Sequence, residues 1–379
     1  MGGLEWKVHY LAKEFAASGH KVTVFTPHPH RAYRSVAAPP AKGYVVIRRG
    51  YPGPGMGRFG VITWLLRRAV RQVHRVNPID VIHCHPLGIP SQIGVSAALG
   101  SGTVVVATTS GGDVAWQTDE GVVERLPPKL HRWVRASAAR LDAIVAVSRS
   151  MRSAINALDV HTRIVDIPNG VAWSEFQGGR SRFLRDKLGI AEGTLIVLSV
   201  GRNIGSKNYR RAMEAFRLAI QTTPDACYVI VGRDVTHLSA TSEARALGPH
   251  VRLVDQQPME LLPSIYHSAD VFLNASLTEG FSQVNAQALA SGLPLVLTDA
   301  PGNVDAGDHG GALIASATDV NDMSQKLIEL LTNRTRREEL ALAAHAAGRH
   351  YAWEKIAGSY LALFEELLSA QRGGRVSDS

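Results

Sequence analysis

The sequence predicts an α/β protein made of two doubly wound domains with parallel sheets. Short apolar runs of five to seven residues alternate with helical patterns along most of the chain. Each run is nearly all apolar, as expected when helices cover both faces of a parallel sheet. A polar, Gly-rich stretch, residues 169–193, interrupts this alternation, and a second strand–helix series starts at Leu195. We therefore place a domain boundary near residue 175.

The predicted strands follow one another in two series. Val, Ile and Leu dominate them, and helical patterns such as residues 8–19 and 210–221 separate most of them. The first series covers residues 21–26, 44–49, 80–85, 103–109, 143–148 and 163–168. The second series covers residues 195–201, 227–232, 251–255, 271–276 and 294–299. The carboxyl ends of such strands face the ligand crevice in doubly wound folds, so we search for functional residues there.

The start of the chain departs from this fold class. A doubly wound domain opens with a strand and a Gly-rich turn before its first helix. Here Gly2 and Gly3 stand directly before the helical pattern 4–20, and no strand-like run precedes them. Two interpretations are open: the reading frame starts too late, or the domain is built without this strand. We expect a late start.

The composition is that of a folded, cytoplasmic protein. The chain is 45% hydrophobic and 20% charged, as in ordinary globular domains. Cys84 and Cys227 both lie in apolar runs, so we expect buried free thiols in a reducing compartment. We find no run of ~18 apolar residues that would span a membrane. The N-terminus carries charges throughout and shows no apolar signal core.

One dense basic patch, residues 64–76, stands out against a net charge of +8 that is otherwise spread along the chain. On a helix, one face of this patch is apolar and the arginines fall elsewhere. The helix has either an ordinary solvated basic side or a surface that docks on an anionic membrane. Nucleic acid is not expected as a partner, because no aromatic–basic interleaving accompanies the charge. The apolar face contains Leu65, Leu66, Ala69, Val73 and Val76, and the arginines are Arg67, Arg68, Arg71 and Arg75.

Two cations lie in the loop that opens the second series. Arg202 and Lys207 stand five residues apart in SVGRNIGSKN, between a strand and a helix. Two cations beside a helix N-terminus suit a pyrophosphate. The alternative is a pair of solvated loop cations.

A lone acid, Glu279, occupies a Glu-Gly-Phe-Ser turn before a small, apolar helix. Gly280 permits close backbone approach, and the N–H groups of Phe281 and Ser282 stand at the helix start. Glu279 is a candidate acceptor for sugar hydroxyls. Gln287 lies eight residues further on, roughly 12 Å along a helix, where it could reach a ribose or simply be a polar helix residue.

Two strand ends of the first series carry weaker signals. The segment 107–116, ATTSGGDVAW, contains Ser110 and Asp113 after a strand. Asp113 either binds a sugar or acceptor hydroxyl or caps the next helix. Asn169 and Gly170 form a turn pair, which we interpret as structural.

In this order and spacing, the segments resemble the GT-B retaining glycosyltransferases of the group 1 type, sequence family 4. The resemblance runs from Gly2 to about Leu368. Its segments are GGLEWKVHYLAKEFAASGHKVTVFT, DVIHCH, AIVAVSRSM, IPNGV, SVGR with Lys207, YVIVG, ADVFLNAS, EGF, ALASGLPLV and the terminal YAWEKIAGSYLALFEELL. It implies a first domain at 1–175 joined by the final helix 353–370, and a nucleotide-sugar domain at 176–352.

The resemblance also implies roles for the residues. Arg202 and Lys207 match the cations that hold the donor diphosphate, and Glu279 matches the acid that contacts the donor sugar. Gln287 stands where the family has its ribose-binding glutamate. Gly2 and Gly3 match the loop beside the donor phosphate. The list of donor contacts is completed by Gly280, Phe281 and Ser282.

Three positions depart from the family pattern. Gln287 replaces a glutamate, and it can accept a ribose hydrogen bond only without charge. Ser110 stands where many members have a histidine near the sugar. Ala172 stands where an acid follows the Asn-Gly turn.

The resemblance implies a metal-independent enzyme without a cofactor. It would move a hexose-type sugar, with retention, from a nucleotide-diphosphate sugar to a glycan, lipid-linked or small-molecule acceptor, as in polysaccharide biosynthesis. Two alternatives stay open. One is a weakened or truncated protein that binds the nucleotide sugar without turnover, and the other is a related GT-B activity such as epimerisation.

Overall fold

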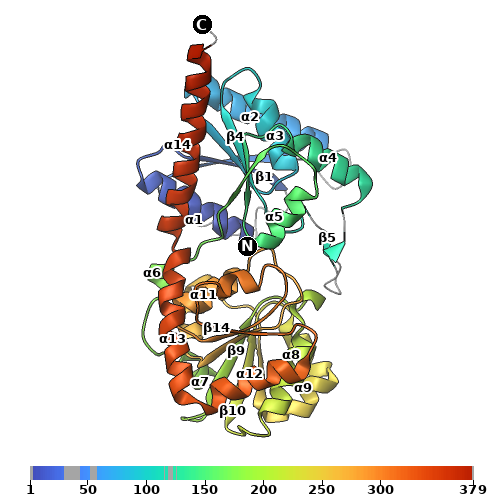
Figure 1. Ribbon diagram of the computed structural model, residues 1–379, viewed down its shortest axis with the longest axis vertical. Coiled ribbons are helices and arrows are strands. Elements are labelled where there is room, and N and C mark those ends of the chain that lie inside the picture. The colour runs from blue at the N-terminus through green and yellow to red at the C-terminus, as the bar shows by residue number, and fades with distance from the viewer. Residues whose placement is uncertain are drawn as a thin grey trace. The chain divides into compact units, whose positions relative to one another are not determined.

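The computed structural model describes residues 3–29, 43–51, 58–114, 116–117, 123–124 and 126–377. The chain forms two compact units (Figure 1). The first unit consists of Met1–Trp116, Arg125–Pro168 and Trp353–Ser379. The second unit consists of Gln117–Glu124 and Asn169–Ala352. Both units are α/β with parallel sheets, which confirms the predicted fold class.

The first unit contains a four-stranded sheet in the order β3-β4-β7-β8, with every neighbouring pair parallel. Strands β1 and β2 form a separate parallel pair, with Thr23 opposite Val45. The central strands β4 and β7 are buried along their whole length. The strands are β1 (Thr23–Pro29), β2 (Val45–Tyr51), β3 (Val81–Cys84), β4 (Val104–Thr108), β7 (Ala143–Ala146) and β8 (Arg163–Asp166).

Six helices accompany these strands in the described part of the first unit. Helix α5 begins with a true cap, because the Ser148 hydroxyl accepts a hydrogen bond from the Met151 N–H. The helices are α1 (Gly3–Ala17), α2 (Arg58–Val76), α3 (Ile89–Ala98), α4 (Pro128–Ala138), α5 (Arg149–Asn156) and α14 (Trp353–Ser377).

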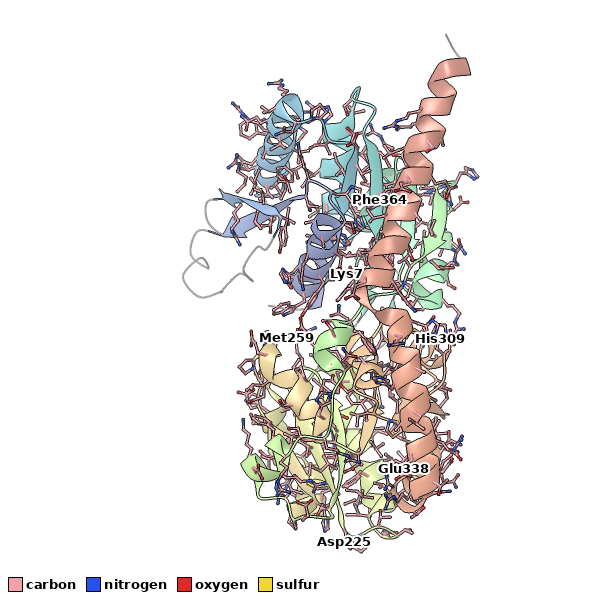
Figure 2. The ribbon with its side chains drawn as sticks, turned by 90° about the vertical axis from the view of Figure 1, so that its left-hand side faces the viewer. Lys7, Asp225, Met259, His309, Glu338 and Phe364 are labelled. Atoms are coloured by element: carbon pink, nitrogen blue, oxygen red, sulfur yellow. The ribbon has the colours of Figure 1, made fainter. Side chains whose placement is uncertain are left out.

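Aromatic rings join the first and last helices of the chain. Tyr10 of α1 stacks on Trp353 of α14 at 5.9 Å between ring centroids. Phe15 meets Tyr360 and Phe364 edge-on, at 6.4 and 5.8 Å. Aromatic pairs of this geometry add to the free energy gained from burial. The aromatic residues of the C-terminal segment therefore fix α14 to the first unit (Figure 2).

The second unit holds a six-stranded parallel sheet in the order β11-β10-β9-β12-β13-β14. Its strands are β9 (Leu195–Val200), β10 (Ala226–Val231), β11 (Val251–Val254), β12 (Val271–Asn274), β13 (Leu295–Thr298) and β14 (Ala312–Ala315). Its helices are α6 (Trp173–Phe176), α7 (Phe183–Leu188), α8 (Tyr209–Ala219), α9 (Ser242–Leu247), α10 (Leu262–His267), α11 (Gln283–Ala290), α12 (Val320–Thr332) and α13 (Arg334–Gly348).

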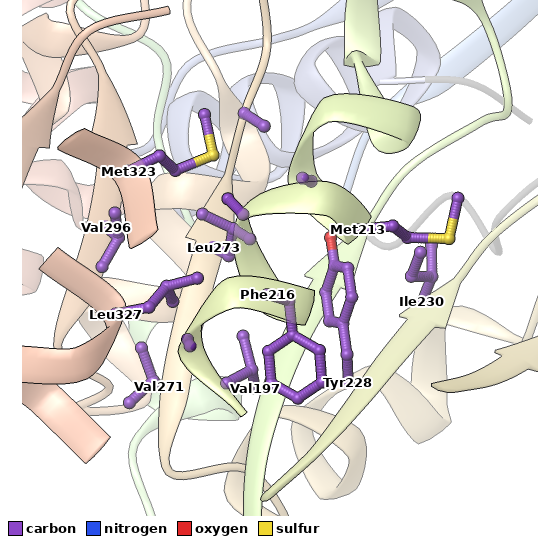
Figure 3. Close-up of a cluster of buried hydrophobic side chains, with 14 of the residues drawn as sticks. Val197, Met213, Phe216, Tyr228, Ile230, Val271, Leu273, Val296, Met323 and Leu327 are labelled. Carbon is purple, nitrogen blue, oxygen red and sulfur yellow. The ribbon is translucent and has the colours of Figure 1, made fainter. Parts of the chain in front are cut away.

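The core of the second unit lies between this sheet and helices α8 and α12 (Figure 3). Phe216 of α8 packs on Tyr228 of β10, with ring centroids 5.4 Å apart. The Tyr228 hydroxyl is hydrogen-bonded to Ser199 Oγ at 2.7 Å, so its polar end is satisfied inside the core. Met323 and Leu327 of α12 are fully buried in the same cluster.

Most predicted elements are found within a few residues of their predicted bounds. The sequence missed β14, a four-residue strand after Gly310 and Gly311, and the short sheet formed by β5 (Trp116–Gln117) and β6 (Val123–Glu124). The polar interruption 169–193 contains the short helices α6 and α7. Cys84 and Cys227 are buried and free, as predicted.

Helix α2 forms where the basic patch predicted a helix, but its buried face differs in part. Leu66, Ala69 and Val70 are buried, whereas Val76 is 79% exposed. The prediction for Val76 is wrong because this residue is the last of the helix, where no neighbouring element covers it. No helix within the described ranges is both long and apolar enough to cross a membrane.

Candidate active site

The candidate site lies in the second unit, where the order of the strands reverses. From β9 the chain proceeds outward to β10 and β11, and it then returns to β12 on the other side of β9 before continuing to β13 and β14. The loops that follow β9 and β12 therefore lead to helices on opposite sides of this point in the strand order. In open α/β sheets this switch point is where ligands bind.

The loop after β9 presents both predicted cations. It closes with a single 3₁₀ turn, Gly205–Lys207, and with Asn208 in a left-handed conformation at φ 55°. Arg202 is exposed, and its guanidinium makes no hydrogen bond or ion pair with any described residue. Lys207 is largely covered, with 17% of its side chain exposed. The loop thus offers one paired and one unpaired cation.

Lys207 and Glu279 form the central contact of the site. Lys207 Nζ donates to Glu279 Oε1 at 2.6 Å, and the Glu279 side chain is 16% exposed. Ser276 Oγ lies 2.9 Å from the same carboxylate oxygen and donates to it. A charge-assisted pair that is mostly shielded from water is stronger than a surface pair. Lys207 and Ser276 therefore fix the orientation of the Glu279 carboxylate.

Backbone hydrogen bonds tie the loops after β9, β12 and β13 together. The Leu277 N–H donates to Ser206 O at 2.8 Å, and the Glu279 N–H donates to Pro301 O at 2.9 Å. Gly302 adopts φ +72°, and a Cβ at this position would lie only 2.0 Å from Glu279 O. The turn that contains Gly302 can thus approach the Glu279 backbone only because it has no side chain.

A buried polar network supports these loops from below. Asn274 Nδ2 donates to Asn285 Oδ1 at 2.7 Å and to Ser282 Oγ at 3.0 Å. Asn285 Nδ2 donates to Asn303 Oδ1 at 2.7 Å. Asn303 Nδ2 donates back to the Asn274 carbonyl at 3.1 Å. Asn274 Oδ1 lies 2.6 Å from Ser276 Oγ, whose single proton is shared between this oxygen and the Glu279 carboxylate. The network therefore reaches the Glu279 carboxylate through Ser276.

This network was not predicted from the sequence. Its asparagines are 0–6% exposed, and such groups are tolerated inside a protein only when they are hydrogen-bonded. A signal was available, because Asn274 ends an otherwise apolar strand and Asn285 lies among alanines in a helix. Their importance depends on partners that are distant in sequence.

Helix α11 begins at Gln283 with Ser282 as its N-cap, so Phe281 and Ser282 stand at a helix start, as predicted. The N–H groups of residues 280–284 find no acceptor among the described residues. Ser282 is the N-cap residue, and its hydroxyl is engaged by Asn274 rather than by the helix N–H groups. Phe281 turns into the protein and packs on Tyr351 at 5.4 Å between ring centroids. The helix end is therefore open to an anion.

Gln287 lies on α11 with its amide already engaged. The Tyr266 hydroxyl donates to Gln287 Oε1 at 2.9 Å. Tyr266 is fully buried, so this bond holds the amide in one orientation. A glutamine has one amide oxygen and one NH₂ group. The NH₂ group of Gln287 is therefore more available to a ligand than its amide oxygen.

The remaining predicted residues belong to the first unit. Asp113 Oδ2 accepts from the Leu87 N–H at 3.0 Å, and Asp113 Oδ1 accepts from the Ser110 N–H at 3.0 Å. Asp113 does not cap the next helix, since α4 begins at Pro128 with Pro127 at its N-cap. The Ser110 side chain is exposed.

The glycines of the predicted N-terminal loop are described only in part. Gly3 is the first residue of α1, and Gly2 lies outside the described residues. A search for groups of three or more His, Cys, Asp or Glu side chains able to hold a metal ion found none in the described part of the chain.

Comparison with known proteins agrees with this geometry. The family "Glycosyltransferase Family 4" matches residues 1–173, and the family "Glycosyl transferases group 1" matches residues 180–347. A mannosyltransferase of Corynebacterium glutamicum, described as GDP-mannose-dependent and acting on a monoacylated phosphatidylinositol monomannoside, is 22% identical, with 76% of each chain covered. A D-inositol 3-phosphate glycosyltransferase of Nocardia farcinica is 26% identical, with 99% of this chain and 87% of the relative covered.

The fold is also that of a solved glycosyltransferase structure. Sucrose-phosphate synthase from Thermosynechococcus elongatus superposes with a TM-score of 0.76 at 19% identity, covering 97% of this chain and 94% of that one. With two parallel sheets and family matches on both sides of residue 175, the chain belongs to the group 1 glycosyltransferases of family 4, GT-B enzymes that transfer a sugar from a nucleotide-sugar donor.

Proposed function

We propose that this chain is a retaining hexosyltransferase whose donor site is the switch point of the second unit. One observation carries the proposal: the Lys207–Glu279 pair at 2.6 Å includes a lysine from the same loop as Arg202, which is exposed and makes no ion pair with any described residue. The free N–H groups of residues 280–284 add partial positive charge at the same edge of the sheet. A diphosphate needs such donors, and a sugar needs an oriented acceptor such as the Glu279 carboxylate.

In the proposed reaction the protein mainly positions groups and stabilises charge. The bond between the anomeric carbon and the diphosphate oxygen breaks, and the acceptor oxygen bonds to the same carbon on the same face. The acceptor proton passes to the departing phosphate oxygen. Arg202 and Lys207 neutralise the charge that develops on this leaving group. Glu279 holds the sugar hydroxyls, and the N–H groups of Gly280, Phe281 and Ser282 face the phosphates.

Gln287 is the proposed ribose contact. Its hydrogen bond with Tyr266 restricts which end of the amide can reach the ribose. With Oε1 held by Tyr266, the NH₂ group would donate to a ribose oxygen. A carboxylate at this position would instead accept from ribose hydroxyls with charge assistance. We therefore expect a weaker ribose contact than a glutamate would give.

The acceptor side is proposed to be the first unit. Gly2, Gly3, Ser110 and Asp113 are the candidates for donor-phosphate, sugar or acceptor contacts. We further propose that no divalent cation is obligatory, because Arg202 and Lys207 supply the positive charge. The acceptor class stays broad: a glycan, a lipid-linked sugar or a small molecule.

A ligand-binding and turnover assay on the full chain tests the proposal. UDP, GDP and ADP are added in turn to thermal melts, since a ligand at 100 times its Kd adds about 2.7 kcal/mol. The matching nucleotide sugars are then incubated with and without EDTA, and nucleoside diphosphate release and product anomer are measured. If a nucleotide raises the melting temperature but no nucleoside diphosphate is released with any of a panel of acceptors, the chain would be a nucleotide-sugar-binding protein and not an enzyme.

We also propose that α2 contacts an anionic membrane surface. Trp64 and Val61 are 48% and 45% exposed on this helix. The Arg68 guanidinium lies 5.5 Å from the centre of the Trp64 ring, so cation and aromatic ring share one surface. Arg71 is not available, because its guanidinium donates to Ser96 O at 2.7 Å. An aromatic ring flanked by arginine is suited to the interfacial region of a bilayer.

Co-sedimentation with vesicles tests this contact. Binding to vesicles with anionic lipid should exceed binding to neutral vesicles, and it should fall with salt. Trp64→Ala combined with Arg68→Ala should reduce it. Arg163→Ala, a change at an exposed arginine on β8, serves as a control for lost charge. Equal loss in both variants would mean that only net charge matters.

A further inference from the structure

Helix α11 begins without a side-chain cap, although its N-cap residue is a serine. A serine at this position usually turns its hydroxyl to accept a hydrogen bond from the second or third N–H group of the helix. The backbone of Ser282 is extended, at φ −78° and ψ 103°, as that of a capping serine is, but its hydroxyl makes no such bond. The hydroxyl must therefore be held by another group.

Other helices of the chain have the usual cap. Ser148, the N-cap of α5, accepts from the Met151 N–H at 3.2 Å. Ser148 and Ser282 are both buried, at 7% and 2% exposure, so neither residue type nor burial explains why only Ser148 caps its helix. Side-chain caps also begin α9, α12 and α13, with Thr241, Asp319 and Asn333.

Asn274, the last residue of β12, holds the Ser282 hydroxyl away from the helix. Asn274 Nδ2 donates to Ser282 Oγ at 3.0 Å and to Asn285 Oδ1 at 2.7 Å. The Ser276 N–H fixes the orientation of this amide, because an N–H group can only donate and it lies 3.1 Å from Asn274 Oδ1. The Ser282 hydroxyl therefore accepts from Asn274 and not from α11.

The other end of the same amide is linked to the Glu279 carboxylate. Asn274 Oδ1 lies 2.6 Å from Ser276 Oγ, and Ser276 Oγ lies 2.9 Å from Glu279 Oε1. Asn274 is 6% exposed and Ser276 is fully buried, so little water competes for these bonds. One side chain thus connects the residue that orients the acid with the residue that begins the helix.

The other helix that begins at the switch point shows the same feature. Asn208 is the N-cap of α8, and its side chain makes no cap bond. Its Nδ2 donates instead to Ala275 O, directly after Asn274, at 3.2 Å. Asn208 and Ser282 are thus the N-cap residues of the Ser, Thr, Asp or Asn type that leave a described α-helix uncapped. Both are held by the end of β12.

We propose that Asn274 is a positioning residue that keeps the start of α11 open for the donor diphosphate and, through Ser276, holds the Glu279 carboxylate in place. An uncapped helix start leaves N–H groups and the positive end of the helix dipole available to an anion. A serine cap would occupy one of these donors and compete with the ligand. The identity of the ligand rests on the proposed function, whereas the uncapped helix start does not.

A double-mutant cycle in the full chain tests this role. Asn274→Ala frees the Ser282 hydroxyl to cap the helix, and Ser282→Ala removes that hydroxyl. Calorimetry measures the Kd for UDP, GDP, ADP and inorganic pyrophosphate. Asn274→Ala should raise the Kd of the wild type by roughly fivefold, which is a serine cap of about 1 kcal/mol converted at about 1.4 kcal/mol per tenfold. In the Ser282→Ala background the same change should raise the Kd by less than about twofold.

Asn303→Ala separates the positioning role from stability. It removes bonds to the Asn274 carbonyl and to Thr298 but leaves the Asn274 amide in contact with Ser276 and Ser282. It should lower the melting temperature and leave the Kd nearly unchanged. The proposal is overturned if Asn303→Ala and Asn274→Ala raise the Kd equally, or if Asn274→Ala acts equally in both serine backgrounds. Asn274→Ser replaces Asn274→Ala if the latter does not melt cooperatively.

Amide hydrogen exchange reports on the helix start without any ligand. Relative to residues 286–290, the N–H groups of residues 283–285 should exchange more slowly in Asn274→Ala than in the wild type, because the freed hydroxyl caps one of them. This protection should be absent when Ser282→Ala is added. Unchanged relative exchange in Asn274→Ala overturns the proposal. If the exchange slows as expected but none of the four ligands binds, the proposed donor site fails and the uncapping role of Asn274 stands.

Discussion

Both units of the protein hold a lysine that is shielded from water and a carboxylate near a strand end, and the two arrangements differ in one respect. In the second unit Lys207 and Glu279 satisfy each other at 2.6 Å. In the first unit Lys7 and Asp113 form no ion pair, because Asp113 accepts from backbone N–H groups instead. Lys7 Nζ is left buried without a hydrogen-bond partner within the described ranges.

The difference shows two ways in which a fold accommodates a lysine that is shielded from water. The Lys207–Glu279 pair is preorganised, since its geometry is set by residues of the protein itself. Lys7 Nζ, in contrast, is a buried polar atom without a hydrogen-bond partner among the described residues. A preorganised pair supports its own loops, whereas a buried polar atom without a partner lowers stability.

The largest expected effect is on the paired site. Lys207→Met and Glu279→Gln should each lower kcat/KM for the donor by roughly 10²- to 10³-fold, as for other losses of a charge-stabilising group. The pair is mostly covered but not fully buried, so unfolding free energy should fall by only about 1 kcal/mol. Lys326→Met, which changes a lysine 3.9 Å from its acid partner, is the control. If kcat/KM is unchanged in Lys207→Met and in Glu279→Gln, the pair does not belong to the donor site.

The buried side chain of Lys7 should make the free energy of unfolding depend on pH. The pKa of Lys7 is lowered from 10.5 to about 7 in the folded state, so the unfolded state binds the extra proton between these values. Stability should therefore rise with pH across this window, by about 5 kcal/mol at most. Below pH 7 the full cost of burying the charge is present.

Urea unfolding of the wild type and of Lys7→Met at several pH values measures how much Lys7 contributes to the pH dependence of the unfolding free energy. The variant should be more stable than the wild type near pH 7, and the difference should shrink toward pH 10. A stability difference that does not vary with pH would show that Lys7 has the same pKa in the folded and unfolded states. It would contradict the argument that burial lowers this pKa.

The network below the paired site should contribute mainly to stability. Asn303→Ala removes bonds to Asn274, Thr298 and Asn285 and leaves buried polar groups unmet. We expect a loss of about 3 kcal/mol in unfolding free energy. Asn321→Ala, at an exposed position of α12, should change it by less than about 0.5 kcal/mol. Equal effects would mean that the network is not specific.

Alanine substitutions at two glycines distinguish the cost of a strained backbone from the cost of a steric clash. Gly302→Ala and Gly189→Ala both place a side chain at positive φ, +72° and +64°. At Gly189 nothing lies within 4 Å of the added Cβ, whereas at Gly302 it meets Glu279 O at 2.0 Å. Gly189→Ala should cost about 1 kcal/mol. Gly302→Ala should cost more and also weaken nucleotide binding, measured by calorimetry.

The smallest expected effect concerns the orientation of Gln287. Tyr266→Phe removes the hydroxyl that holds Oε1 at 2.9 Å. One hydrogen bond contributes about 1 kcal/mol, so the Kd for the nucleoside diphosphate should rise by about fivefold. Tyr228→Phe, which loses a bond to Ser199 in the core, controls for the loss of a buried hydroxyl. An unchanged Kd would place Gln287 outside the donor site.

Most of the fold and part of the site could be predicted from sequence. Apolar runs and helical periods located the strands of both sheets, because period and burial are local properties. Arg202, Lys207 and Glu279 were proposed as site residues because polar residues stand out where strands end. Strand β14 was missed, since four residues beside two glycines carry too little pattern.

The sequence by itself determined the fold class, the family and the residues that end each strand. The tertiary structure alone decided which side chains pair: Lys207 pairs with Glu279, 72 positions away, whereas Lys7 Nζ has no hydrogen-bond partner in the part of the chain that the structure describes. Lys7 stands on the buried stripe of α1, but this pattern does not reveal an unmet hydrogen bond. Partnership depends on distances between segments that are remote in sequence, and only packing fixes those distances.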